Sequence, residues 1–327
     1  PIRLPATATE ARCIGVSTGG YLVAGHDDGR LAVWQLPAQD GQAPRFIRAH
    51  VTGVAVLDTV TLPAHGVEAG EDVCISGGED RAVHLCSLAQ ARLLDSVDAK
   101  APVTALVAHK QRAVVGNKEG TLMVLDVTEV GPGLSVVATL MGHTEAVLAL
   151  HAAHKLAATA SQDTTLRLWS LQRDGAPPHD TRPPMRGRRE LVRVGGRCVG
   201  VFRGHTGPVS CCSLQRRRLI SGSWDETVRV WELTTARCLY TIKGFHHDRV
   251  WSLRASHSTL VSTALDHSVA VFSFGDDAFA LPQAARLCPQ CLSRPLPPAP
   301  CRCLCSVTRR PSGSSGPQHI PNTRPSM

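Results

Sequence analysis

The sequence lacks long hydrophobic runs. No apolar stretch approaches the roughly 18 residues that suggest a membrane span. The chain also begins with Pro1 rather than Met, and its start lacks the basic, apolar and small-residue zones of a secretory signal. We therefore expect a protein without a membrane span, and a sequence that is a fragment or a processed product.

Three short motifs of catalytic and ligand-binding sites are also missing. The sequence contains no GxGxxG, no GxxxxGK and no HExxH, which are the patterns of dinucleotide sites, phosphate-binding loops and zinc proteases. The histidine pairs His151/His154 and His246/His247 have no third ligand that recurs near them. We expect no catalytic residues, no cofactor and no metal site.

Acidic residues are absent from the last part of the chain. Residues 278–327 contain six Arg and no Asp, Glu or Lys, and residues 171–197 contain seven Arg against three acidic residues. These two stretches carry more than the whole net charge of +8, so the remainder is close to neutral. We expect solvated basic segments rather than a groove that follows a phosphate backbone.

Seven of the twelve cysteines are scattered, mostly among Val, Leu and Ile, where a free thiol behaves as a small apolar side chain. The other five lie near the carboxyl end, as a CxxC at 288–291 and a CxCxC at 301–305. The second spacing does not favour zinc. We expect reduced thiols and an intracellular protein, cytoplasmic or nuclear.

One unit of about 40 residues recurs along the chain. Residues 204–233 (GHTGPVSCCSLQRRRLISGSWDETVRVWEL) align without a gap with residues 142–171 (GHTEAVLALHAAHKLAATASQDTTLRLWSL), and fainter copies end in residues 22–36, 74–88, 113–127 and 260–274. Each copy has an acidic residue at the same turn position. The six turn acids are Asp28, Asp80, Glu119, Asp163, Asp225 and Asp266.

The pattern of each copy predicts short strands rather than helices. Apolar or alternating runs separated by Gly, Asp and Ser predict strands at 209–214, 219–222, 227–231 and 238–243. Strands this regular at such a period predict an all-β propeller.

The copies resemble the WD-repeat family over residues 2–274, and two of them have the Gly-His pair, the turn Asp and the Trp in place. The resemblance implies a WD-repeat β-propeller with six visible four-stranded blades in residues 1–277. Residues 58–72 lengthen a turn, and residues 171–197 form a flexible insertion. We expect residues 278–327 to be a mostly disordered tail rich in Pro, Ser, Arg and Cys.

The resemblance also implies a buried polar chain from the His of each Gly-His pair to the turn Asp, a Ser or Thr, and the Trp. Blade four has His143, Asp163, Thr159 and Trp169, and blade five has His205, Asp225, Ser221 and Trp231. Blade six has His246, Asp266 and Ser262 with Phe272, and blade two has His50, Asp80 and Ser76 with Cys86. Blades one and three lack the His and the hydroxyl, so we expect them to depend more on apolar packing.

Two ring sizes remain open. Residues 2–4 sit as far before the first inner strand as residues 240–242 do before the last, so they are candidates for an outer strand that completes blade six and closes a six-bladed ring. The alternative is a seven-bladed ring whose missing blade precedes Pro1. We favour six blades.

In propellers of this kind, partners usually dock on the face formed by the loop before each inner strand and the turn before the third strand. The residue before each turn acid should point there: Asp27, Glu79, Lys118, Gln162, Trp224 and Leu265. An exposed Trp is costly unless something covers it, so we expect Trp224, with Arg249 and Trp251 beside it, to form the main contact. The alternative is that Trp251 fills the central channel.

We predict a non-catalytic scaffold, a subunit of a larger complex, that binds a protein or peptide through Trp224, Trp251, Arg249, Gln162 and Leu265. One alternative is a substrate-recognition subunit of a ubiquitin ligase, because residues 221–231 and 248–253 resemble the propellers of F-box proteins. Phosphodegron-reading members have Arg where this chain has Trp224, Ser210 and Trp251, which disfavours phosphate recognition. The other alternative is RNA or acidic-lipid binding through the Arg-rich insertion and tail.

Overall fold

The computed structural model describes residues 9–37, 43–62, 71–109, 111–127, 133–153, 155–171, 197–215, 217–256, 258–273 and 283–287. These residues form 24 strands and no helix, and thus no helix suited to crossing a membrane. The strands pair antiparallel into six four-stranded sheets, each of which is one blade. The prediction of an all-β propeller with six four-stranded blades is confirmed.

The strands of each blade pair in chain order. Blade one contains β1 (Ala11–Val16), β2 (Tyr21–His26), β3 (Arg30–Gln35) and β4 (Arg45–Arg48). Blade two contains β5 (Val54–Leu62), β6 (Glu71–Gly78), β7 (Ala82–Ser87) and β8 (Arg92–Asp98). Blade three contains β9 (Val103–His109), β10 (Arg112–Asn117), β11 (Leu122–Val127) and β12 (Leu134–Leu140).

The last three blades follow the same plan. Blade four contains β13 (Val147–Ala153), β14 (Leu156–Ser161), β15 (Leu166–Ser170) and β16 (Arg197–Phe202). Blade five contains β17 (Val209–Leu214), β18 (Arg218–Ser223), β19 (Val228–Glu232) and β20 (Cys238–Ile242), within one residue of the predicted strands. Blade six contains β21 (Val250–Ala255), β22 (Thr259–Ala264), β23 (Val269–Ser273) and β24 (Gln283–Leu287).

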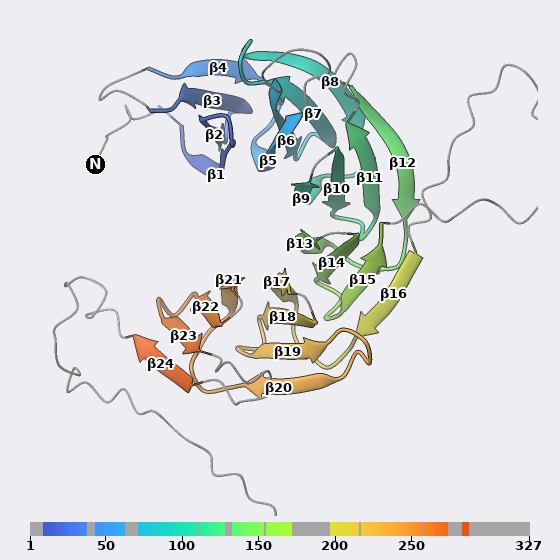
Figure 1. Ribbon diagram of the computed structural model, residues 1–327, viewed down its shortest axis with the longest axis vertical. Coiled ribbons are helices and arrows are strands. Elements are labelled where there is room, and N and C mark those ends of the chain that lie inside the picture. The colour runs from blue at the N-terminus through green and yellow to red at the C-terminus, as the bar shows by residue number, and fades with distance from the viewer. Residues whose placement is uncertain are drawn as a thin grey trace, which may run out of the picture.

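The blades stand side by side around a common centre, with the first strand of each blade innermost (Figure 1). Each inner strand contacts the inner strand of the next blade, from β1 and β5 through to β17 and β21. A gap separates β1 from β21 in Figure 1. The described strands therefore form an open arc rather than the closed six-bladed ring that we favoured.

One apolar cluster fills each of the five junctions between neighbouring blades. Because successive side chains of a strand point to opposite faces of the sheet, each inner blade contributes side chains to two different junctions. In blade five, Leu219 and Trp231 pack against blade four, whereas Ile220, Val228 and Val230 pack against blade six. Each blade thus has two apolar faces and depends on a neighbour on each side.

At the two ends of the arc, blade six and blade one each lack a described neighbour on one side, and apolar side chains there are more exposed. Val261, Val269 and Val271 of blade six occupy the positions of Ile220, Val228 and Val230, but they are only partly buried. The corresponding residues of blades one to five are at most 5% exposed. At the other end, Ile14 and Val16 of β1 are 68% and 60% exposed. The arc therefore ends in an apolar face on each side.

The expected closure through residues 2–4 is wrong because blade six has a different outer strand. Strand β24 pairs with β23 from Ser273↔Gln283 to Val269↔Leu287, so it occupies the edge that residues 2–4 would need. It also extends the propeller past residue 277. The sequence QAARL has no β-branched or aromatic residue, so composition gave no sign of this strand. Residues 2–4 lie outside the described residues.

The expected long turn at residues 58–72 is also corrected. Strand β5 runs to Leu62 and β6 begins at Glu71, and the two strands stay paired from Asp58↔Ile75 to Leu62↔Glu71. The extra residues therefore lengthen a hairpin. Residues 63–70 lie outside the described part of the chain, as do residues 172–196 of the Arg-rich insertion.

The open end of blade six yields a matched test. Val230 and Val271 occupy equivalent positions, but Val230 is fully buried and Val271 is only partly buried. We expect Val230→Ala to lower the free energy of unfolding by about 2 kcal/mol and Val271→Ala by less than about 1 kcal/mol, because less apolar surface is lost. Urea unfolding of both variants measures the difference, and equal losses would show that the blade-six face is covered.

Candidate functional site

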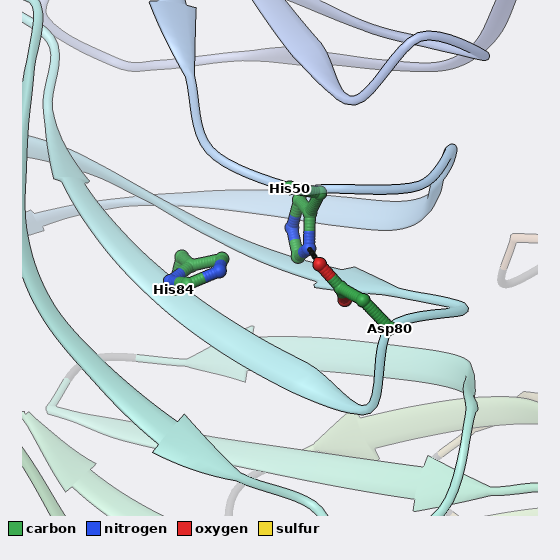
Figure 2. Close-up of side chains that lie close together, drawn as sticks. All are labelled: His50, Asp80 and His84. Carbon is green, nitrogen blue, oxygen red and sulfur yellow. Dashed lines mark hydrogen bonds and ion pairs between the residues drawn. The ribbon is translucent and has the colours of Figure 1, made fainter.

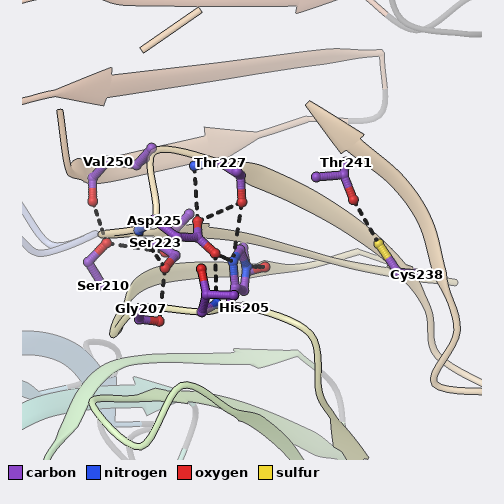
Figure 3. A network of polar contacts seen from close by, with 12 residues as sticks. His205, Gly207, Ser210, Ser223, Asp225, Thr227, Cys238, Thr241 and Val250 are labelled. Carbon is purple, nitrogen blue, oxygen red and sulfur yellow. Dashed lines mark hydrogen bonds and ion pairs between the residues drawn. The ribbon is translucent and has the colours of Figure 1, made fainter. Parts of the chain in front are cut away.

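A buried polar network fixes the turn between the second and third strands of blade five (Figure 3). His205 Nδ1 lies 2.8 Å from Asp225 Oδ2, and its Nε2 lies 2.8 Å from Ser221 Oγ. Trp231 Nε1 donates to the same Ser221 Oγ at 2.8 Å. The structure thus brings together the four residues that the family resemblance implied for this blade.

Blade four repeats this network. His143 Nδ1 lies 2.7 Å from Asp163 Oδ2, and His143 Nε2 lies 2.7 Å from Thr159 Oγ1. Trp169 Nε1 donates to Thr159 Oγ1 at 2.9 Å. In both blades the indole is at most 2% exposed, so the hydroxyl satisfies an N–H group that has lost its contact with water.

The turn carboxylate also accepts hydrogen bonds from its own turn. Asp225 accepts the backbone N–H of Thr206 at 3.0 Å and the hydroxyl of Thr227 at 2.6 Å. Burial opposes ionisation of this carboxyl, yet the hydrogen bonds from His205 and Thr227 hold the pKa of Asp225 well below its ordinary value. Burial lowers the pKa of His205 despite the neighbouring Asp225. The network therefore combines an ionised Asp with a neutral His.

Blade six uses a variant of the network. His246 Nε2 lies 2.7 Å from Ser262 Oγ, and its Nδ1 lies 2.6 Å from Ser268 Oγ. Asp266 accepts the backbone N–H of His247 at 2.8 Å and the Ser268 hydroxyl at 2.5 Å. Phe272 stands at the Trp position, and its ring meets Phe245 edge-on with centroids 5.2 Å apart. An apolar contact thus replaces the indole hydrogen bond.

Blade two adds a second histidine beside its network (Figure 2). His50 Nδ1 lies 2.9 Å from Asp80 Oδ1, and His50 Nε2 lies 2.9 Å from Ser76 Oγ. The His84 ring meets the His50 ring edge-on with centroids 4.5 Å apart. One ligand atom from each of His50, Asp80 and His84 lies within 4.8 Å of the others. A metal ion would have to displace Asp80 or Ser76 from His50, because both of its nitrogens are already engaged.

Blades one and three use other means, as their sequences suggested. In blade one, Ala24 takes the place of the hydroxyl residue, and the buried Trp34 Nε1 has no hydrogen-bond partner among the described residues. In blade three, Asn117 Nδ2 donates to the Ala99 carbonyl at 3.1 Å, while its Oδ1 accepts the backbone N–H of Glu119 at 3.1 Å. Ser161 and Ser223 have the same role at the equivalent positions of blades four and five, since each accepts the backbone N–H of its turn Asp and donates to a backbone carbonyl. Comparison of the repeats did not single out this position.

One pentapeptide fits the GxSxG pattern of serine hydrolases, at residues 15–19. In those enzymes the pattern lies on a turn from a strand into a helix. Here Ser17 lies in the turn from β1 to β2, and its Oγ accepts the backbone N–H of Tyr21 at 3.0 Å. Ser17 is 6% exposed. Its hydroxyl is therefore used to shape a hairpin.

The turns also place one residue per blade on a common rim. The residue before each turn acid donates its backbone N–H to the carbonyl of the residue that precedes or caps the inner strand, at 2.9–3.4 Å in all six blades. The six donor–acceptor pairs are Asp27–Glu10, Glu79–Gly53, Lys118–Pro102, Gln162–Ala146, Trp224–Pro208 and Leu265–Arg249. The backbone therefore repeats around this face while its side chains differ.

Aromatic and apolar side chains gather on the rim of blades five and six. The Arg249 guanidinium lies over the Trp224 ring, 4.4 Å from its centroid, so the two residues link the two blades. Trp251 is 60% exposed and Leu265 is 44% exposed. This exposure argues against the reading in which Trp251 is buried as a plug of the channel.

Gln162 is exposed on the neighbouring blade four. No described side-chain contact joins it to Trp224, Arg249 or Trp251. We name Trp224, Arg249, Trp251 and Leu265 the tryptophan patch.

The opposite side of the rim has a different character. Arg12 of blade one forms ion pairs with Asp27 of its own blade and with Glu79 of blade two, the latter at 2.8 Å. The hydrogen bond to Glu79 and the charge of Asp27 raise the pKa of Arg12. The rim of blades one and two thus satisfies its own charges, whereas the tryptophan patch presents unpaired apolar surface.

Loss of one network histidine should destabilise the propeller. His205→Ala leaves Asp225 and Ser221 without their shared partner, and we expect a loss of about 3 kcal/mol in the free energy of unfolding. His109→Ala, at an exposed position at the end of β9, should change stability by less than about 0.5 kcal/mol. Chemical denaturation measures both, and similar values for the two variants would contradict a stabilising network.

Acid should destabilise the fold in two steps. Burial holds the pKa of His50 and His205 below their ordinary 6.5, so the unfolded chain binds these protons first and stability falls as pH drops below about 6.5. The carboxyls of Asp225 and Asp266 have lowered pKa values, that of Asp266 about 2, so a second loss begins near pH 4. Unfolding free energies between pH 7.5 and 3 measure this, and a flat profile from pH 7.5 to 5 would refute the first step.

Comparisons with known proteins agree with this architecture. Residues 134–170 and 196–232 match the family described as WD domain, G-beta repeat. A crystal structure of the computationally designed Ika8 protein is similar in fold, with a TM-score of 0.65 at 21% identity over 87% of this chain and 82% of that one.

The curated relatives match part of the chain. An F-box/WD-40 repeat-containing protein of Arabidopsis thaliana is 30% identical over 160 residues, 38% of this chain and 29% of that protein. Mitochondrial division protein 1 of Schizosaccharomyces pombe is 33% identical over 135 residues, 41% of this chain and 19% of that protein. Cell division control protein 4 of Saccharomyces cerevisiae is 34% identical over 76 residues, 23% and 10% of the two chains.

The matches span less than a third of the length of these relatives. The residues matched to the family description include the turn Asp, histidine and tryptophan of the networks of blades four and five. On these matches and its six four-stranded blades, the chain contains two WD repeats and has the fold of a WD-repeat β-propeller.

Proposed function

We propose that the chain is a non-catalytic scaffold that binds a protein partner on the tryptophan patch, as part of a larger complex. The observation that carries the proposal is the 60% exposure of Trp251, which lies two residues after the Arg249 that stacks on Trp224. Large aromatic side chains and Arg dominate the energetics of protein interfaces. WD-repeat proteins generally act as interaction scaffolds, which supports the same conclusion.

The rest of the molecule is consistent with a scaffold. The turn acids, which have the chemistry of general acids or bases, are bound within the networks and recur from blade to blade. A single active site does not require such repetition. The seven described cysteines are free thiols, which supports a reducing compartment, and we propose a cytoplasmic or nuclear location.

A second candidate function is substrate recognition within a ubiquitin ligase. It is favoured by the F-box/WD-40 repeat-containing relative. In that setting the tryptophan patch would hold the substrate. An RNA or acidic-lipid role for the Arg-rich insertion and tail concerns residues outside the described part of the chain, and salt-sensitive binding lost on deletion of residues 171–197 would support it.

Substitution of the patch tests the proposal. We expect Trp251→Ala and Trp224→Ala to reduce recovery of the partners that copurify with the wild-type chain, with a loss of about 2 kcal/mol or roughly 30-fold in affinity at a hot spot. Phe46→Ala is the matched control, because Phe46 is 43% exposed on the outer strand β4. Affinity purification with quantitative mass spectrometry measures recovery, and undiminished recovery with both folded Trp variants would overturn the site.

A further inference from the structure

The tryptophan patch contains one cation whose charge is not matched by a carboxylate. The Arg249 guanidinium stacks on Trp224, and among the described residues it takes part in no ion pair. The nearest acid in sequence, Asp248, uses its Oδ1 to accept the Arg249 backbone N–H at 2.7 Å. Asp225 and Asp266 are likewise occupied by their turns.

Arg12 on the same rim is a useful comparison, because it has carboxylates within reach. Arg12 stands at the inner-strand position that Trp251 holds in blade six, and it pairs with both Asp27 and Glu79. At the positions of Asp27 and Glu79, blades four to six carry Gln162, Trp224 and Leu265, none of which is acidic. The charge of Arg249 is therefore available to a ligand on this face, whereas the charge of Arg12 is already neutralised by two carboxylates.

Stacking also prepares Arg249 to bind. A guanidinium packed over an aromatic ring still has N–H groups that can donate two parallel hydrogen bonds to a carboxylate. The ring restricts the long side chain beforehand, which lowers the entropy lost on binding. Trp251 and Leu265 supply exposed apolar surface on the same blade.

We propose that the partner presents a carboxylate to Arg249 and an adjacent apolar side chain to Trp251 and Leu265. The ligand is thus a peptide segment in which Asp, Glu or the chain's own carboxyl terminus neighbours a large apolar residue. This inference rests on the proposed function, because it names the ligand of the same patch.

A synthetic peptide library tests the inference on the full chain. The probes are N-acetylated, C-amidated hexapeptides with four randomised central positions, and the fluorescently labelled chain is the reporter. We expect the best binders to combine Asp or Glu with a large apolar residue. Replacing that Asp or Glu by Asn or Gln should weaken binding at least about 10-fold, as expected for a charge-assisted pair. The same sequences made as free acids distinguish a side-chain carboxylate from a chain end.

Variants of the two arginines separate charge from packing. Arg249→Gln should remove the preference for acidic peptides, and Arg249→Glu should replace it with a preference for Lys or Arg peptides. Arg12→Gln, the matched control on the same rim, should leave the acidic preference unchanged. Binders without a carboxylate, or an acidic preference that survives Arg249→Gln, would overturn the inference. Displacement of the peptides by single-stranded oligouridylate at equal concentration would instead assign the patch to phosphate.

The outcomes also separate this inference from the function on which it rests. If Trp224→Ala and Trp251→Ala leave peptide binding and partner recovery unchanged, the patch itself is refuted. If both Trp variants abolish binding while Arg249→Gln has no effect, the interaction site stands and only the carboxylate is refuted.

Discussion

Every blade turns from its second to its third strand through one residue in the left-handed backbone region. In four blades that residue carries a side chain, with φ between 60° and 68° at Arg81, Thr164, Glu226 and His267, a conformation that costs roughly 1 kcal/mol or more. These are the four blades that have both the histidine and a turn Asp, which are bonded directly in blades two, four and five and through Ser268 in blade six. Blades one and three lack that histidine and use Gly29 and Gly120, for which the conformation carries no such cost.

Within each of these turns, neighbouring residues have different roles: some stabilise the fold, and one is available for binding. The turn acid and the residues after it are committed to the network, while the residue before the acid is fixed only through its backbone N–H. Its side chain is free to vary without loss of the fold. Blades one and two use this freedom for Asp27 and Glu79, which neutralise Arg12. Blades five and six use it for Trp224 and Leu265, which leave an apolar surface beside Arg249.

Most of the architecture follows from the repeat, because a 40-residue period with a turn acid fixes strand number and register together. The networks of blades four and five follow for the same reason: His205, Asp225, Ser221 and Trp231 stand in a fixed sequence relation. Strand β24 does not follow, because an edge strand is held by its backbone pairing and QAARL carries no β signal. The stacking of Arg249 on Trp224 joins blades five and six. The sequence indicated that these two blades are neighbours, but it did not indicate that the guanidinium lies over the indole.

The open arc makes its two outermost blades different from the other four. In a stack where stability depends on nearest neighbours, a unit with a single interface frays first. Blade six is such a unit, since only blade five covers it among the described residues. A ligand that touches both Trp224 and Arg249 would bind across that one junction. It would therefore act as a clamp, and amide hydrogen exchange at the carboxyl-terminal end of the arc would slow when the face is occupied.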